Sequence, residues 1–306
     1  PTTPISAQAL TWQLGEYGYI ASDEVGLALY LALKLQKPLL IEGPPGVGKT
    51  ELAKAAAATL DQPLIRLQCY EGVDEAKALY EWKYGKQLLY TQILKQQIDQ
   101  VVGDGDTLAA SMEKLHAMDD IFFSERFVEP RPLLKALQQP GGAVLLIDEI
   151  DKSDEEFEAL LLEILSDYQV SIPEIGTVAA RQIPLAILTS NQTRELSDAL
   201  RRRCLHLYIP FPGMQQEIAI LRSRIPDLSA HLAQQMAAFV EHLRQLELGK
   251  QPAISETIDW GRALLLLHAD TLDNTTVLAT LNVLLKHKTD VDAVAEQLPQ
   301  LLGSSP

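Results

Sequence analysis

The chain has 306 residues, 47% hydrophobic and 22% charged, a composition typical of a globular protein large enough for two domains. Its formal net charge of −15 disfavours binding to phosphate backbones, so no nucleic-acid partner is expected. The two cysteines, Cys69 and Cys204, have no metal-ligand spacing and are expected to be buried thiols. No apolar run is long enough to span a membrane and no signal peptide opens the sequence, which predicts a cytoplasmic protein.

Short apolar segments alternate with helical patterns as far as about residue 209. An amphipathic helix is expected over residues 22–36. Strands are expected at residues 38–42, 64–68, 143–147, 185–188 and 205–209. Strands separated by helices predict an α/β fold, in which a parallel sheet carries helices on both faces.

Residues 210–213, Pro-Phe-Pro-Gly, end this alternation. Only helical patterns follow, at residues 214–225, 228–247, 255–269, 274–287 and 290–302. We therefore predict an α/β domain over residues 1–210 and a small all-helical domain over residues 211–306.

Two segments are additions to the strands and helices of a minimal α/β domain. Residues 69–140 separate two expected strands, are longer than a usual crossover and are rich in aromatic residues. Residues 168–183 carry β-branched side chains around Pro-Glu-Ile-Gly at 173–176, which predicts a hairpin.

Residues 43–50 match the phosphate-binding pattern G-x-x-x-x-G-K-[ST]. The strand before this loop and the helix after it aim backbone N–H groups and a helix dipole at one point, which favours a polyphosphate. Lys49 is expected to neutralise the β- and γ-phosphates of a nucleotide, and the Thr50 hydroxyl to ligate Mg²⁺. The alternative, a chance match in a glycine-rich turn, is disfavoured by these flanking elements. The expected nucleotide-binding residues are Gly43, Pro44, Pro45, Gly46, Val47, Gly48, Lys49, Thr50 and Glu51.

Two carboxylates, Asp148 and Glu149, follow an almost wholly apolar strand. Ligands of open α/β sheets bind at the carboxyl ends of the strands, so both side chains are expected beside the phosphate-binding loop. Asp148 is expected to hold Mg²⁺, and Glu149 to polarise the attacking water as a general base. The alternative is a pair of solvated acids. Residues 153–156, Ser-Asp-Glu-Glu, have capping-box spacing, which predicts Ser153 as the cap of the next helix.

Asn191 follows the fourth expected strand, where its amide is expected to bond the γ-phosphate or the attacking water. A lone asparagine at a strand end is more usually a turn residue. Arg201, Arg202 and Arg203 precede the fifth strand, and such a run is usually a solvated helix end. In a ring-forming ATPase, an arginine at this place reaches into the neighbouring active site; Arg203 is expected first and Arg202 second.

Together these residues resemble those of an AAA+ ATPase, and more narrowly those of the MoxR family, in its branch associated with von Willebrand factor A domain proteins. The narrower resemblance rests on Arg-Leu-Gln-Cys-Tyr-Glu-Gly at 66–72, Leu-Tyr-Glu-Trp at 79–82, Glu-Pro-Arg-Pro-Leu-Leu-Lys-Ala at 129–136, Val-Leu-Leu-Ile-Asp-Glu-Ile-Asp at 144–151 and Ile-Ser-Glu-Thr-Ile-Asp-Trp-Gly-Arg at 254–262. It covers about residues 15–290. It implies an insert over about 69–100, a hairpin over 168–183 that faces the ring pore or the client, and a helical lid.

One stretch departs from the family pattern. Many relatives open a lid helix with Ser-Pro-Arg, whose arginine senses the γ-phosphate, whereas residues 255–257 here are Ser-Glu-Thr. Either Arg262, about two turns along the helix, substitutes for that arginine, or the lid senses the nucleotide only weakly. Gln68, at the end of the second strand, is expected to hold Glu149 away from water until a client binds.

The resemblance implies an Mg²⁺-dependent ATPase that forms a ring, expected to be a hexamer. It further implies chaperone-like remodelling or maturation of a protein client, such as a metalloenzyme, together with a partner that carries a von Willebrand factor A domain. One alternative is a DNA-directed AAA+ motor, which the acidic balance disfavours. Another is a nucleotide-binding scaffold with negligible turnover, which the intact set of Lys49, Asp148, Glu149 and Asn191 disfavours.

Overall fold

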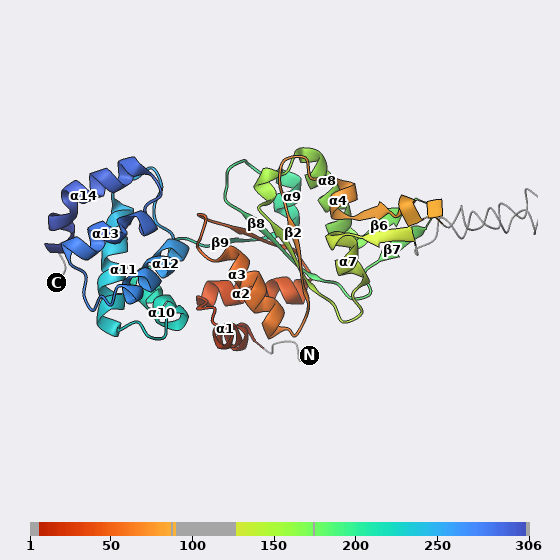
Figure 1. Cartoon of the computed structure of the whole chain (residues 1–306). Helices are drawn as coiled ribbons and strands as arrows, with labels where there is room; N and C mark the ends of the chain where they lie inside the picture. The colour runs from red at the N-terminus through yellow and green to blue at the C-terminus, as the bar shows by residue number, and fades with distance from the viewer. Residues whose placement is uncertain (1–5, 87, 90–126, 174, 304–306) are drawn as a thin grey trace, which may run out of the picture.

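The computed structural model describes residues 6–86, 88–89, 127–173 and 175–303 of the chain. A parallel five-stranded sheet with strand order β2-β5-β8-β1-β9 forms its centre (Figure 1). The strands are β1 Leu39–Glu42, β2 Leu64–Gln68, β5 Val144–Asp148, β8 Leu185–Ser190 and β9 Leu205–Tyr208. The five expected strands and the α/β fold are therefore confirmed.

Side chains of the strands alternate between two hydrophobic clusters, one on each face of the sheet. In β1, Leu39 and Ile41 belong to one cluster, and Leu40 belongs to the other. The first face is covered by α1 Ala7–Glu16, α2 Asp23–Leu35 and α3 Lys49–Thr59. The second face is covered by α4 Glu75–Ala78, α7 Pro132–Gln138, α8 Glu155–Asp167 and α9 Asp198–Arg203.

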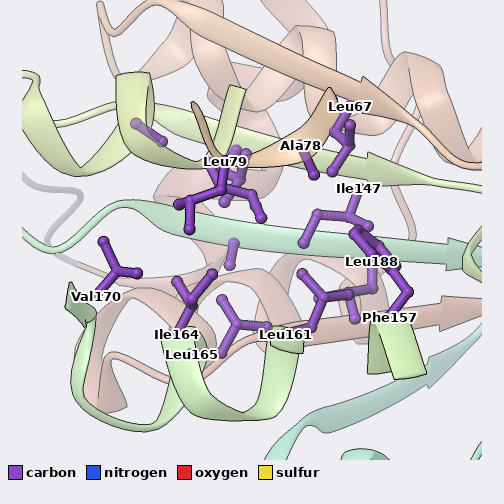
Figure 2. Close-up of a cluster of buried hydrophobic side chains, with 14 of the residues drawn as sticks. Leu67, Ala78, Leu79, Ile147, Phe157, Leu161, Ile164, Leu165, Val170 and Leu188 are labelled. Carbon is purple, nitrogen blue, oxygen red and sulfur yellow. The ribbon is translucent and has the colours of Figure 1, made fainter. Parts of the chain in front are cut away.

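Packing against α8 fixes the strand that ends in the two carboxylates. Ile147 and Leu188, from neighbouring strands, lie close to this helix (Figure 2). Four fully buried apolar side chains of α8 complete the contact at helical spacing: Phe157, Leu161, Ile164 and Leu165. Burying a side chain of this size contributes about 1.5–3 kcal/mol, so this face holds the end of β5 firmly in place.

The start of α8 differs from the prediction by one residue. Asp154 is the cap, since its carboxylate accepts a hydrogen bond from the Phe157 N–H at 2.9 Å. The Ser153 hydroxyl instead donates to the Ile150 carbonyl at 2.8 Å, which closes the short 3₁₀ turn η2 Ile150–Lys152. The predicted role of Ser153 is therefore wrong, because the turn after β5 already uses its hydroxyl.

Five described helices follow Gly213: α10 Met214–Arg224, α11 Ala230–Gln245, α12 Ile254–Leu266, α13 Asn274–Leu284 and α14 Lys288–Gly303. They bury a hydrophobic cluster of their own around Trp260, whose indole N–H donates to the Thr280 hydroxyl at 2.8 Å. Figure 1 shows these helices at one end of the sheet. The division into domains at residue 210 stays a prediction. Among the helices that the structure describes, none is long and apolar enough to cross a membrane.

Two small sheets extend the α/β part. The predicted hairpin is confirmed as β6 Gln169–Ile172 paired with β7 Gly176–Ala179, and Figure 1 shows it far from α10–α14. β3 Tyr80–Trp82 pairs antiparallel with β4 Val128–Pro130, a pairing that was not expected from the sequence. Residues 90–100 of the expected insert lie outside the described residues.

Both cysteines are free thiols, and they differ in burial. Cys69 is buried, as expected, whereas Cys204 is only partly buried. Burial raises the pKa of each thiol to about 12, so neither is a reactive thiolate near neutral pH.

A buried ion pair joins α11 to α10. The Arg244 guanidinium bonds both carboxylate oxygens of Glu217, at 2.6 and 3.0 Å, and also the carbonyls of Pro212 and Pro252. Only 10% of the Arg244 side chain and 1% of the Glu217 side chain are exposed. Burial raises the pKa of Glu217, and Arg244 opposes this shift.

Removing this arginine is expected to destabilise the fold. Arg244→Ala lowers the free energy of unfolding by about 3–5 kcal/mol, because Glu217 becomes an uncompensated buried charge. The folded pKa of Glu217 then rises further above its unfolded value, so the folded protein binds more protons than the unfolded chain. The loss of stability is therefore smaller at about pH 5 than at about pH 8. Urea unfolding at the two pH values measures this difference.

The matched control is Arg262→Ala, which breaks the exposed ion pair of Arg262 with Asp259 on α12. Exposed pairs contribute about 0–1 kcal/mol. Equal losses in the two variants would contradict the structural role of Arg244.

Candidate active site

The expected phosphate-binding loop connects β1 to α3, and two of its glycines sit where no other residue fits. Gly43 has φ of +151°, and a Cβ atom on it would lie 2.1 Å from the Ile209 carbonyl oxygen. Gly46 has φ of +77°, and a Cβ atom there would lie 2.6 Å from the Ala253 Cβ atom at the start of α12. The loop therefore packs closely against both the residue that follows β9 and the start of α12.

Lys49 lies at the start of α3 with its side chain folded back over the loop. Its ammonium group donates to the carbonyls of Gly43 and Pro44 at 2.7 and 2.8 Å. Burial lowers the pKa of Lys49 to about 8, although Asp151, Asp148 and Glu149 act in the opposite direction. The ammonium group is thus held at the loop by backbone carbonyls.

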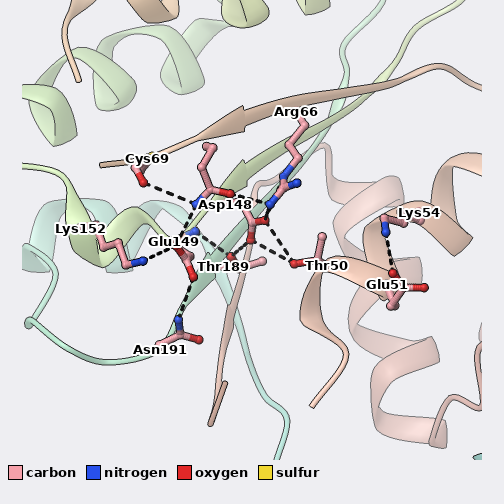
Figure 3. A network of polar contacts seen from close by, with 11 residues as sticks. Thr50, Glu51, Lys54, Arg66, Cys69, Asp148, Glu149, Lys152, Thr189 and Asn191 are labelled. Atoms are coloured by element: carbon pink, nitrogen blue, oxygen red, sulfur yellow. Dashed lines mark hydrogen bonds and ion pairs between the residues drawn. The ribbon is translucent and has the colours of Figure 1, made fainter. Parts of the chain in front are cut away.

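Asp148 is the last residue of β5, and its carboxylate accepts hydrogen bonds from side chains of three other elements (Figure 3). The Thr50 hydroxyl lies 3.2 Å from both carboxylate oxygens, and the Thr189 hydroxyl lies 2.5 Å from one of them. The Arg66 guanidinium of β2 donates to the same carboxylate through Nε at 3.1 Å and Nη2 at 2.6 Å. The structure therefore brings Thr50 and Asp148 together, as predicted from positions 98 residues apart.

Glu149 follows in the left-handed region, with φ of +58°, a conformation that is uncommon for non-glycine residues. Its carboxylate accepts hydrogen bonds from Gln68 Nε2 at 2.8 Å, Lys152 Nζ at 2.6 Å and Asn191 Nδ2 at 3.4 Å. The expected contact between Gln68 and Glu149 is present, and Asn191 reaches the same carboxylate from the end of β8 (Figure 3).

Two adjoining cavities meet at Gly48 and Glu51. The smaller, of about 230 Å³, is lined mostly by charged and polar residues and lies over the loop and the carboxylates. Its lining comprises Pro45, Gly46, Gly48, Lys49, Thr50, Glu51, Asp148, Glu149, Thr189, Asn191 and Ser255. The larger, of about 270 Å³, is mainly apolar, and its walls include Tyr19, Ile20, Val47, Ile209, Ile254 and Ile258. Arg224 of α10 reaches Glu51 at 3.0 Å and so links the helical part to this site.

The three arginines of α9 have different surroundings. Arg201 donates to the buried Glu42 at 2.6 Å, a carboxylate that also contacts His206. The Arg203 guanidinium bonds the carbonyls of Leu165 and Ser166, where α8 ends. Arg202 is exposed and makes no side-chain hydrogen bond or ion pair with a described residue. Arg203, expected first as the arginine for a neighbouring site, is thus engaged within its own subunit.

The Arg262 side chain does not line either cavity. Its guanidinium is exposed and lies 3.4 Å from Asp259 on the same helix. Ser255, at the start of α12, faces the loop instead, because the first turn of that helix packs against Gly46. The expected role of Arg262 as a nucleotide sensor therefore has no support in this geometry.

Several residues at the site were not singled out from the sequence: Tyr19, Arg66, Thr189, Arg224 and Ser255. Thr189 directly precedes Ser190-Asn191 at a strand end, a position that could have drawn attention. Arg66 lies two residues before Gln68, and residues at this spacing share a face of a strand. Arg224 and Tyr19 carry no local signal, because the tertiary fold alone brings them to the loop.

The chain matches the family described as AAA domain (dynein-related subfamily) over residues 38–204. It is 25% identical over 238 residues to gas vesicle ATPase GvpN of Haloferax mediterranei, covering 72% of this chain and 61% of that protein. It is 25% identical over 287 residues to gas vesicle ATPase GvpN2 of Halobacterium salinarum, covering 89% of this chain and 75% of that protein. Among solved structures, it is similar to the Holliday junction branch migration motor RuvB of Thermotoga maritima, with a TM-score of 0.45 and 19% identity over 85% of this chain and 67% of that one. Because the family match extends over more than half of its residues, the chain belongs to the AAA domain (dynein-related subfamily) of the AAA+ ATPases.

Proposed function

We propose that this chain binds ATP together with Mg²⁺ and hydrolyses it. The observation that carries the proposal is the convergence of Lys49, Thr50, Asp148, Glu149 and Asn191 on one polar cavity. They come from the start of α3 and from the ends of β5 and β8. This combination supplies a phosphate cradle, a candidate metal site and a candidate general base.

The residues around Asp148 fit Mg²⁺. The Thr50 hydroxyl and the Asp148 carboxylate, 3.2 Å apart, are hard oxygen donors, and Mg²⁺ typically binds one or two such protein groups while keeping several waters. Bound there, the ion would neutralise charge on the nucleotide phosphates. The adjoining apolar cavity suits the flat face of the adenine base, with Ile254 and Ile258 contributed by α12.

Each of these protein groups has a separate proposed role in ATP hydrolysis. Lys49 stabilises negative charge on the phosphates, and backbone N–H groups at the start of α3 add to it. Glu149 accepts a proton from the attacking water, and Asn191 orients that water or the γ-phosphate. Gln68 and Lys152 hold the Glu149 carboxylate in the observed state, so Glu149 acts as a base only after these contacts loosen.

Lys49→Ala is expected to weaken ATP binding about 10- to 100-fold. A hydrogen bond to a charged group contributes about 1.5–3 kcal/mol, and about 1.4 kcal/mol corresponds to tenfold in affinity. Isothermal titration calorimetry with a non-hydrolysable ATP analogue measures the change, and phosphate release measures the accompanying loss of turnover.

Lys54→Ala provides the matched control on the same helix. Lys54 pairs with Glu51 at the surface and does not line the polar cavity. Its removal is expected to leave ATP affinity within about threefold of the native value, since exposed pairs contribute about 0–1 kcal/mol. Unchanged affinity in Lys49→Ala would contradict the proposed site.

Beyond the ATPase reaction, we propose that the chain acts in the cytoplasm as a ring, most simply a hexamer, that remodels a protein client. This extends the resemblance to the MoxR family, including a partner with a von Willebrand factor A domain. The β6–β7 hairpin, far from α10–α14, is the proposed client-facing element. The net charge of −15 argues against a DNA substrate. A salt-dependent DNA-binding titration tests that alternative, and tight binding would support it.

A further inference from the structure

The Arg66 guanidinium makes a two-pronged contact with the carboxylate of Asp148. Both nitrogens, Nε at 3.1 Å and Nη2 at 2.6 Å, donate to the same oxygen, Oδ2. Asp148 is almost fully buried, with 4% of its side chain exposed, whereas 49% of the Arg66 side chain is exposed. The buried charge of Asp148 is therefore balanced by a cation that reaches in from the surface.

The Arg66 guanidinium thus binds the same carboxylate that is proposed to bind Mg²⁺. Asp148 Oδ2 also receives the Thr50 hydroxyl at 3.2 Å, so the guanidinium and the candidate metal-ligand pair share one oxygen. A carboxylate oxygen has few lone-pair directions, and a guanidinium bound in this way neutralises much of its charge. Arg66 and a divalent cation therefore compete for Asp148.

The position of Arg66 lets it leave the site. β2 is an edge strand of the sheet, so the half-exposed side chain can swing toward solvent. Gln68, on the same face of β2, holds the guanidinium in place, because its Oε1 accepts a bond from Arg66 Nη2 at 2.5 Å. Gln68 Nε2 in turn donates to Glu149. Arg66 and Gln68 thus connect the two carboxylates of the site.

We propose that Arg66 is a resident counter-ion of Asp148 that must leave this carboxylate before the metal is bound. The proposal rests on the proposed Mg²⁺-dependent ATP site. Its consequence is that Arg66 lowers the affinity of the site for metal and leaves metal-free nucleotide binding unaffected, because it does not line the polar cavity.

The test compares the dissociation constant of a non-hydrolysable ATP analogue in EDTA with that in saturating Mg²⁺. Arg66→Met removes the charge and keeps an unbranched stem. The dissociation constant in EDTA divided by that in Mg²⁺ is expected to rise about fivefold. This corresponds to about 1 kcal/mol, the contribution of a half-exposed ion pair. The constant in EDTA is expected to stay at the wild-type value. Gln68→Ala, which loosens the hold on Arg66, is expected to raise the ratio by a smaller factor, about twofold.

Arg181→Met serves as the control, because Arg181 is exposed and precedes β8 at the other end of the strand. It is expected to leave both constants unchanged. An unchanged or smaller ratio in Arg66→Met, with normal binding of the analogue, would overturn the role of Arg66 alone. Weaker binding of Arg66→Met in EDTA would also overturn it, since the arginine would then contact the nucleotide. If the wild-type protein itself binds no analogue, the proposed function fails and this proposal fails with it.

Discussion

Glu149→Gln is expected to bind ATP and to hydrolyse it at least about 100-fold more slowly than the wild-type protein. An amide of the same shape keeps the steric fit of the site but cannot accept the proton of the attacking water, and a general base typically contributes about 10²–10⁴ in rate. Lys49 and the loop, which are proposed to contact the phosphates, remain intact. Steady-state phosphate release and calorimetric titration with ATP separate the two effects.

The control for this substitution is Glu156→Gln, a change of the same chemistry at an exposed position of α8. Its turnover is expected to match that of the wild type. If Glu149→Gln also turns over at the wild-type rate, Glu149 is not the base. If it fails to bind ATP, the carboxylate has a role in holding the loop that the observed contacts do not indicate.

The sheet could be predicted because consecutive residues in the sequence carry the pattern of each strand. Apolar strands such as 144–148 stand out in the sequence, and the loop at 43–50 carries its chemistry in consecutive residues. The rule that ligands bind at the carboxyl ends of parallel strands then placed Asp148 and Glu149 beside the loop. The structure confirms this juxtaposition, with Thr50 and Asp148 in direct contact.

The partners of the long polar side chains could not be predicted, since they lie far apart in the sequence. Arg66 bonds a carboxylate 82 residues away, and Arg201 bonds one 159 residues away. A guanidinium on a flexible stem can reach many acceptors, and nothing in its neighbouring residues selects one of them. For the same reason the order expected from the sequence, Arg203 before Arg202, had no physical basis, whereas the contacts of these arginines in the fold distinguish them.

These contacts lead us to expect Arg202 as the arginine that acts on a neighbouring subunit. Arg201 is committed to the buried Glu42, and Arg203 to the carbonyls that end α8. Arg202 is exposed and, unlike the other two, bonds no described residue through its side chain. Arg202→Ala is expected to lower ATP turnover by about 10³–10⁵, the contribution of a trans-acting arginine in nucleotide hydrolases that use one. ATP affinity is expected to change little, because Arg202 does not line either cavity of its own subunit.

Arg203→Ala is the informative comparison. Its guanidinium caps the carbonyls of α8, so its loss is expected to lower thermal stability by removing hydrogen bonds, each contributing about 0.5–1.5 kcal/mol. Turnover measured well below the unfolding temperature is expected to stay within about tenfold of the wild type. The reverse ranking, with Arg203→Ala the inactive variant, would restore Arg203 as the trans-acting residue.

Mixed assemblies test whether the arginine acts across a boundary between subunits. Arg202→Ala and Glu149→Gln subunits are each nearly inactive alone. When they are mixed, some interfaces pair an intact Glu149 of one subunit with an intact Arg202 of the next, so partial activity is expected to return. Specific activity of the wild type is also expected to rise with protein concentration, because a site that needs Arg202 of a neighbouring subunit is complete only in an assembly. Activity that is independent of concentration, together with no recovery in the mixture, would mean that the α9 arginines serve only their own subunit and that the chain hydrolyses ATP as a monomer.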